Sequence, residues 1–543
     1  MTEPPQPPPN QPPPPSGYGH LPGPPQPGYG YPPPGGNPYA QQPPTVPQPP
    51  VQPGGYGFPP PPGGPGAPAG PPPGGRRKGA VLVAAAAVGV LVLGAGAWFV
   101  FGGDDERPKQ PVAQGSTPAD PKPSASVDKG DGSGNGSGEQ TDLNAGRKPG
   151  EDKALWLKTV KLQSSGSGGI STRGQWVVGD TIAKTIGNTV VGYGTADGKE
   201  KWKIDVRAEI CGIAAQATAD GKTVVIVKDG AGSNAECNQL KQIDLKAGKE
   251  GWTKEVVKES LFGGGASATL SLTGDTVVVN RLGGTSAYRV STGDKLFSGN
   301  VPEGCQPTQY AAGRDKVLGI ALCMDADRTV EVQDADPVTG KKSWAYRLPK
   351  GWQVNGVYSV FPAVLDIGNR DTKERAVIAL TADGKKRSAM AAEGSFAVNC
   401  GSSTLDDLQG CGDAAVDGDT LYLMTDTKGG DNNEIVAFDL ATGKPKWRRA
   451  AGDKRSLSPL KAAGGQLIAY HTGALDQPGE IISIPVAGGT PTTLLRLPSG
   501  PAAKIEGSFM FSQRAFQDGR FFLSVTTLMA NSTDEKFLMA FGK

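Results

Sequence analysis

The sequence has 543 residues, and its 80 glycines and 50 prolines are unevenly spread, because much of the proline lies in the first hundred residues. Lys and Arg total 55 against 53 for Asp and Glu, so neither charge dominates and nucleic acid is not predicted as a partner. The two histidines, His20 and His471, are too few for a histidine-rich metal site.

Residues 1–75 are a mixture of Pro, Gly, Gln and Tyr in which Glu3 is the sole charged residue. Such a composition buries too little apolar surface to offset its chain entropy, so we expect a disordered tail with polyproline II character. This tail is interpreted as a spacer, or as a ligand for partners that recognise proline-rich segments.

A predicted membrane anchor follows at residues 76–102. Arg76, Arg77 and Lys78 precede an uncharged apolar run from Gly79 to Phe101, which is long enough for one transmembrane helix. The basic residues before it predict a cytoplasmic N-terminus. A cleaved signal peptide is the alternative, but the run is too long and lies too far from the start of the chain. Residues 103–150, rich in Pro, Gly and Ser, are predicted to form a flexible polar linker.

From residue 151 to 543 a short motif recurs in which a glycine stands four residues before a tryptophan. Alternating apolar residues flank it, and glycine supplies the positive φ of a tight turn, so each copy predicts a β-hairpin. Repeat units of about 40 to 60 residues predict the four-stranded blades of a β-propeller. The four full copies and two weaker ones are Gly198 with Trp202, Gly248 with Trp252, Gly340 with Trp344, Gly443 with Trp447, Gly293 with Phe297, and Gly384 with Ser388.

The hairpin strands predict how many blades there are. Eight segments fit the first strand of the hairpin, ending with KFLMAFGK at the C-terminus, but only seven segments follow a turn as its second strand. DKALWLKTV, which contains Trp156, fits the missing eighth partner. We therefore predict an all-β, eight-bladed propeller closed by pairing of both chain ends, with a seven-bladed ring as the alternative.

The segment AFDLATGKPKW, from Ala437 to Trp447, resembles the tryptophan-docking motif A-x-D-x-x-T-G-x-x-x-W. This motif is typical of PQQ-type repeats, the quinoprotein alcohol dehydrogenase-like β-propellers. The resemblance covers about residues 150–543, and it implies that each tryptophan packs against the glycine turn of a neighbouring blade. Blades three, five and seven depart from the pattern because they lack the tryptophan.

The same resemblance leaves two functional classes open. Quinoprotein dehydrogenases hold PQQ over the propeller axis, usually with calcium, whereas outer-membrane assembly propellers and sensor propellers of membrane kinases are not enzymes. The sequence has no adjacent cysteines, no C-x-x-C-H and no recognisable Glu/Asn/Asp calcium set. We therefore predict no catalytic residue, no cofactor and no metal, and place the chain in the non-enzymatic branch.

Six cysteines lie after residue 200, and none forms a C-x-x-C pair. Sequential pairing is one of fifteen connectivities, and it is favoured because each pair then lies within one predicted blade. Such disulfides indicate a location outside the cytoplasm. The predicted pairs are Cys211 with Cys237, Cys305 with Cys323, and Cys400 with Cys411.

Other chemistry-bearing residues are interpreted as ordinary features of propeller turns. His471, near Tyr470 and Asp476, is a lone imidazole without a G-x-S-x-G motif nearby. Several acidic residues could bind calcium but are more typical of solvated turns, namely Asp325, Asp327, Asp334, Asp336 and Asp431.

The combined prediction is a single-pass membrane protein with its propeller outside the cell and its tail in the cytoplasm. Its expected function is that of an envelope scaffold or sensor that binds a protein partner or a small ligand. The alternative is a PQQ-dependent dehydrogenase.

Overall fold

The computed structural model describes most of the C-terminal three-quarters of the chain. The described residues are 142–162, 169–232, 234–256, 265, 267–282, 284–299, 304–397, 408–409, 411–426, 432–452, 454–473, 477–509, 512–530 and 533–543. The predicted tail at 1–75, the predicted transmembrane helix at 76–102 and most of the predicted linker lie outside them. Within the described part of the chain, no helix has the length and apolar character needed to cross a bilayer.

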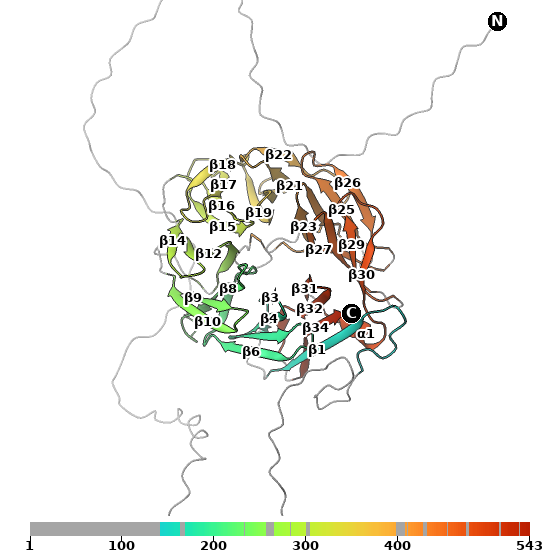
Figure 1. The fold of residues 1–543 in the computed structure, drawn as a ribbon. Coiled ribbons are helices and arrows are strands. Elements are labelled where there is room, and N and C mark those ends of the chain that lie inside the picture. The colour runs from blue at the N-terminus through green and yellow to red at the C-terminus, as the bar shows by residue number, and fades with distance from the viewer. Residues whose placement is uncertain are drawn as a thin grey trace, which may run out of the picture. The chain divides into compact units, whose positions relative to one another are not determined.

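Eight four-stranded antiparallel sheets form the ring in Figure 1, and the first strands that the figure labels in blades 1 and 4 to 7 lie nearest its centre. Blade 1 consists of β3 (Gln175–Val178), β4 (Thr181–Ile186), β5 (Thr189–Gly194) and β6 (Glu200–Asp205). Blade 2 consists of β7 (Ile210–Ile213), β8 (Lys222–Lys228), β9 (Cys237–Asp244) and β10 (Lys249–Glu255). Blade 3 consists of β11 (Thr269–Thr273), β12 (Thr276–Arg281), β13 (Gly284–Arg289) and β14 (Lys295–Ser298). Blade 4 consists of β15 (Pro307–Gly313), β16 (Lys316–Leu322), β17 (Val330–Ala335) and β18 (Lys342–Arg347).

The second half of the ring repeats this order. Blade 5 consists of β19 (Trp352–Ser359), β20 (Val364–Asn369), β21 (Arg375–Leu380) and β22 (Lys386–Ala389). Blade 6 consists of β23 (Ala414–Asp417), β24 (Thr420–Met424), β25 (Glu434–Asp439) and β26 (Pro445–Ala450). Blade 7 consists of β27 (Leu457–Ala463), β28 (Gln466–His471), β29 (Glu480–Pro485) and β30 (Thr492–Arg496).

Blade 8 is built from both ends of the propeller. Its strands are β31 (Ser512–Gln517), β32 (Arg520–Val525), β34 (Asp534–Gly542) and, on the outside, β1 (Lys153–Lys161). β1 pairs antiparallel with β34 and sets Trp156 opposite Ala540. The prediction of an all-β, eight-bladed ring closed by the two chain ends is confirmed, and the seven-bladed alternative is wrong.

Two smaller elements lie outside the four-stranded sheets. The helix α1 (Pro501–Glu506) lies in the connection between blades 7 and 8. The short strands β2 (Ile170–Ser171) and β33 (Thr527–Leu528) pair with each other, which joins the connection after β1 to blade 8.

Hydrophobic periodicity explains the position of each strand. Middle strands are continuous apolar runs buried on both faces, as in β8, where Val224, Val225 and Ile226 are fully buried. Outer strands alternate, as in β26, where only Trp447 and Arg449 are half-buried. The core lies between blades, since one cluster joins Val224 and Ile226 of blade 2 to Val277 and Val279 of blade 3.

The propeller begins earlier than the sequence predicts. Leu143 is buried in the core between blades 7 and 8, although it lies in the predicted linker. Asn144 fixes this segment because its side chain exchanges two hydrogen bonds of 3.0 Å with the backbone of Ala154 in β1. One apolar residue within a polar, glycine-rich stretch gives too weak a pattern to indicate packing.

Candidate functional site: the face of the long connections

The antiparallel order of each blade separates its connections onto two faces of the ring. The turn face carries the connections between first and second strands and between third and fourth strands, for example 179–180 and 195–199 in blade 1. The loop face carries the connections between second and third strands and between blades, for example 187–188 and 390–413.

The connections on the two faces differ in length. Six of the eight first turns on the turn face have two residues, as between β3 and β4. On the loop face, residues 390–413 connect blade 5 to blade 6, and residues 497–511 connect blade 7 to blade 8. Long connections held on a rigid scaffold are the usual place for binding residues, so the loop face is the candidate functional site.

Two described disulfides belong to this loop face. Cys211 in β7 is bonded to Cys237 in β9, and Cys305 is bonded to Cys323 at the base of the connection 323–329. These two predicted pairs are confirmed. Cys411 is also disulfide-bonded, while Cys400, its predicted partner, lies outside the described residues. The disulfides therefore stabilise the face that carries the long connections.

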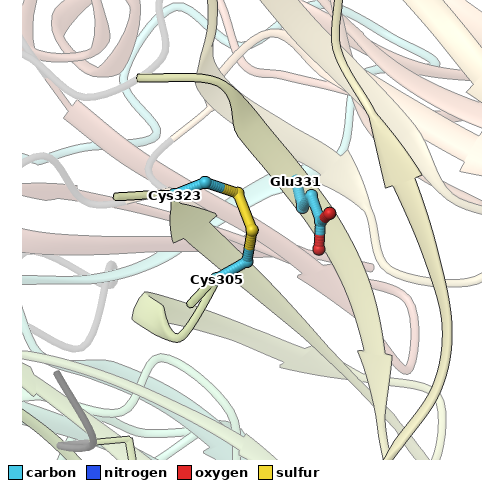
Figure 2. Close-up of side chains that lie close together, drawn as sticks. All are labelled: Cys305, Cys323 and Glu331. Carbon is cyan, nitrogen blue, oxygen red and sulfur yellow. A yellow bond between two sulfur atoms is a disulfide. The ribbon is translucent and has the colours of Figure 1, made fainter. Parts of the chain in front are cut away.

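One group of side chains in the described residues has the spacing of a metal site, and it is drawn in Figure 2. It consists of Cys305, Cys323 and Glu331, but a disulfide joins the two sulfur atoms. Glu331 is nearly buried, and its Oε1 lies 3.0 Å from Nη2 of Arg347. Because disulfide sulfurs are not thiolate ligands, this group is a structural cross-link beside an ion pair.

The docking motif lies on the opposite, turn face. Five turn glycines have positive φ and lie against the tryptophan of the preceding blade, so closely that a Cβ atom on the glycine would clash with the ring. The built Cβ would lie 2.6 Å from Trp156 at Gly198, 2.2 Å from Trp202 at Gly248, 2.7 Å from Trp252 at Gly293, 2.4 Å from Trp344 at Gly384, and 2.8 Å from Trp447 at Gly488.

Blades 3 and 5, which lack the tryptophan, keep part of this contact. Phe297 replaces the ring in blade 3 and would lie 2.7 Å from a Cβ atom on Gly340. In blade 5, Ser388 donates a hydrogen bond of 2.7 Å to the carbonyl of Leu440, three residues before Gly443. The indole of Trp252 donates to the carbonyl at the same place in its turn, Val290, at 2.8 Å. Serine therefore retains the hydrogen bond and loses the ring packing.

A buried acid that sequence reasoning missed lies between blades 7 and 8. Glu506, the last residue of α1, is 5% exposed and accepts a hydrogen bond of 2.5 Å from the hydroxyl of Tyr470. Its other carboxylate oxygen is buried and has no hydrogen-bond partner among the described residues. Nearby, the guanidinium carbon of Arg514 lies 5.3 Å from the centre of the Tyr470 ring, and Nε of Arg514 is buried and also lacks a hydrogen-bond partner.

Burial governs the ionisation of this cluster. Loss of hydration raises the pKa of Glu506 to about 7, although Tyr470 and the positive charge of Arg455 lower it in part. Burial and the adjacent carboxylate raise the pKa of Tyr470 well above its ordinary value. Glu506 therefore changes charge near neutral pH.

Lys184 in β4 is a second buried ionisable residue, on the other side of blade 8. Its side chain is fully buried, and Nζ donates to the side chain of Gln513 at 2.9 Å and to the carbonyl of Val525 at 3.3 Å. No described carboxylate forms an ion pair with it, so loss of hydration lowers its pKa to about 7. Both interfaces of the closing blade thus contain a group that titrates near neutrality.

The connection 390–413 also reaches the innermost strands of the ring. The side chain of Gln409 exchanges two hydrogen bonds of 2.9 Å with the backbone of Ala312 in β15. The carbonyl of Leu408 accepts from the backbone of Val357 in β19 at 2.6 Å. This connection therefore contacts the innermost strand of blade 4 besides blades 5 and 6, the pair that it joins.

The remaining candidates from the sequence form ordinary local contacts. His471 lies 2.7 Å through Nε2 from the carbonyl of Ala451, and its Nδ1 lies 3.6 Å from Glu480. Asp431 and Asp476 lie outside the described residues. The other acidic residues form local ion pairs or hydrogen bonds within their turns. Asp327 forms an ion pair with Lys350, and Asp334 forms one with Lys316. Asp325 accepts a hydrogen bond from Thr329, and Asp336 accepts one from Thr339.

Comparison with known proteins adds a family match. The family model described as "Outer membrane protein assembly factor BamB" matches residues 145–319, which run from the start of the propeller into β16. No curated protein sequence matches.

Three solved structures are similar at low identity. BamB from Moraxella catarrhalis has 14% identity and a TM-score of 0.40, over 71% of this chain and 97% of that one. Dihydro-heme d1 dehydrogenase NirN in complex with DHE has 12% identity and a TM-score of 0.37, over 64% and 69%. The β-propeller domain of Cps50 (Swd1) from Myceliophteria thermophila has 11% identity and a TM-score of 0.34, over 58% and 96%.

Proposed function

Because this chain is a PQQ-type repeat β-propeller protein, we propose that it is a scaffold of the cell envelope that binds a protein partner. The family description, an outer membrane protein assembly factor, supports a role in protein interaction at the envelope. In this proposal residues 76–102 anchor the protein in the cell membrane, with the tail in the cytoplasm and the propeller outside. The disulfides of the propeller support that side of the membrane.

The observation that carries the proposal is the difference between the two faces of the ring. The loop face combines long connections with disulfides, and a covalent cross-link beside a binding surface lowers the entropic cost of binding. It also carries the three most exposed large apolar residues in the described part of the chain, Met324 (79%), Met529 (67%) and Leu282 (63%). Exposed apolar side chains on a pre-organised surface favour a protein partner.

Site-specific crosslinking in intact cells tests this proposal. A photoreactive amino acid at Met324 or Met529 should yield defined protein adducts, which mass spectrometry can identify. The matched controls are Val338 and Phe361, which are exposed apolar residues on the turn face. Equal adducts from both faces, or none from Met324 and Met529, would contradict the loop face as the binding surface.

The alternative, a PQQ-dependent dehydrogenase, finds little support in the described residues. No three carboxylates among them converge closely enough to bind a calcium ion. The purified full chain should therefore show neither stoichiometric PQQ after incubation with PQQ and calcium nor dye-linked alcohol oxidation. Tight PQQ binding with turnover would replace the scaffold proposal by the enzyme.

A further inference from the structure

A small pocket lies at the boundary between blades 6 and 7, away from the loop face. Its volume is about 350 Å³, which lies at the lower end of the range for ligand sites. The outer strand β26 forms one wall, and the turn between β29 and β30 forms the other. Residues at the pocket include Trp447, Arg448 and Arg449 from β26 and Gly488, Gly489 and Thr490 from the turn.

Comparison of this turn with the equivalent turns of the other blades explains why a pocket is present beside it. In five other blades a lysine follows the docking glycine directly, at Lys199, Lys249, Lys341, Lys385 and Lys444. In blade 7 the docking glycine is Gly488, and the next residue is Gly489, which has no side chain. A Cβ atom placed on Gly489 would meet nothing within 4 Å, so the space beside it is open.

Of the two arginines in the walls of this pocket, one has no acidic partner among the described residues. Arg448 is paired, since its Nη1 lies 3.1 Å from Oε2 of Glu434. Arg449 is half-buried, and its Nη1 donates a long hydrogen bond of 3.4 Å to the carbonyl of Gly489. Among the described residues no carboxylate forms an ion pair with Arg449. A half-buried guanidinium without a carboxylate is the expected recognition group for an anionic ligand.

We propose that this pocket binds a carboxylate, supplied by an acidic side chain of an extended segment of a partner protein. β26 is the outer strand of blade 6, and among the described strands it pairs with β25 alone, so its other edge offers backbone groups that an extended segment can use. β26 contains Lys446, Arg448 and Arg449 and no acidic residue, which complements an acidic segment in charge. The site is independent of the proposed loop-face interaction.

The test measures binding of a fluorescein-labelled hexaglutamate peptide to the purified full chain by fluorescence anisotropy at low salt. We expect saturable binding, about tenfold weaker in Arg449→Gln, because a charge-assisted hydrogen bond is lost. Thr490→Glu should weaken it similarly by placing a carboxylate in the pocket. Lys254→Gln is the matched control, because Lys254 also lies two residues after its docking tryptophan, Trp252, and contacts the next turn at Gly293.

Several outcomes would overturn the proposal. Equal binding by wild type and Arg449→Gln would show that Arg449 does not recognise the peptide. An equal loss in Lys254→Gln would indicate general attraction to basic strands, and equal binding of a hexaglutamine peptide would exclude the carboxylate. Citrate that binds at least as tightly as the peptide, in a manner that depends on Arg449, would identify a small carboxylate as the occupant and overturn the protein segment. Unchanged circular dichroism and melting temperatures would show that the variants are folded.

Discussion

Glu506 and Lys184 lie at the two interfaces of blade 8, and each is buried with neutral hydrogen-bond partners. Burial shifts the pKa values of these two side chains in opposite directions. The folded state favours the protonated, neutral form of Glu506 and the deprotonated, neutral form of Lys184, because burial penalises either charge. The stability of the closing blade therefore depends on pH in two separate windows.

Glu506 governs the acidic window. Its pKa is about 7 in the folded protein and 4.5 ordinarily, so the folded state retains a proton that the unfolded chain releases. The contribution of Glu506 to the free energy of unfolding should therefore fall as pH rises from about 4.5 to about 7. In urea unfolding, Glu506→Gln should gain stability relative to wild type between pH 5 and pH 8. A constant difference between the two proteins would contradict this.

Lys184 governs the alkaline window. Its pKa is about 7 in the folded protein and 10.5 ordinarily, so the unfolded chain binds a proton that the folded state has released. Its contribution to stability should rise as pH increases from about 7 to about 10.5. Melting temperatures at pH 7 and pH 9 check this, since Lys184→Met should lose that increase. Lys203→Met, at an exposed lysine of the same blade, is the control.

At the scale of single elements, the contact between turn glycine and tryptophan joins each blade to the next. Gly198 combines a φ of 64° with direct contact to the fully buried Trp156, whereas Gly179 has a φ of 57° and open space around it. Gly198→Ala should cost about 2–4 kcal/mol, from left-handed strain and a steric clash, and Gly179→Ala about 1 kcal/mol from strain alone. Free energies of unfolding from urea titration check this, and equal costs would show that the ring contact contributes nothing.

The sequence predicts the features of the propeller that rest on a repeated motif, and it misses those that rest on a single residue. Eight hairpin strands and the unmatched Trp156 predict the blade number and the ring closure, because each copy supports the others. Ser388 could not be assigned, since one hydroxyl that replaces the hydrogen bond of an indole has no pattern of its own. Glu506 and Tyr470 are separated in sequence and meet only through packing of blades 7 and 8. Lys184 did leave a signal, a charge within the apolar strand TIAKTI.

For the whole molecule, closure depends on one outer strand. Deleting Lys153–Lys161 removes β1, exposes the edge of β34 and leaves Gly198 without Trp156. We expect dimers or larger species in size-exclusion chromatography with light scattering, because an unpaired strand edge associates with other chains. A synthetic peptide with the sequence KALWLKTVK should restore the monomer. A deletion variant that remains monomeric without the peptide would contradict this role of β1.

The pairing of β1 with β34 also sets the order of events during synthesis. About 370 residues separate Lys161 from Asp534, and a ribosome adds about 5–20 residues per second. The first strand of the propeller therefore waits roughly 20 to 75 seconds for its partner, while blades 1 to 7 can form from contiguous sequence. Throughout that interval β1 has no partner strand, although the blade 1 turn that contacts Trp156 is already made, so β1 is an unpaired edge strand until β34 is synthesised.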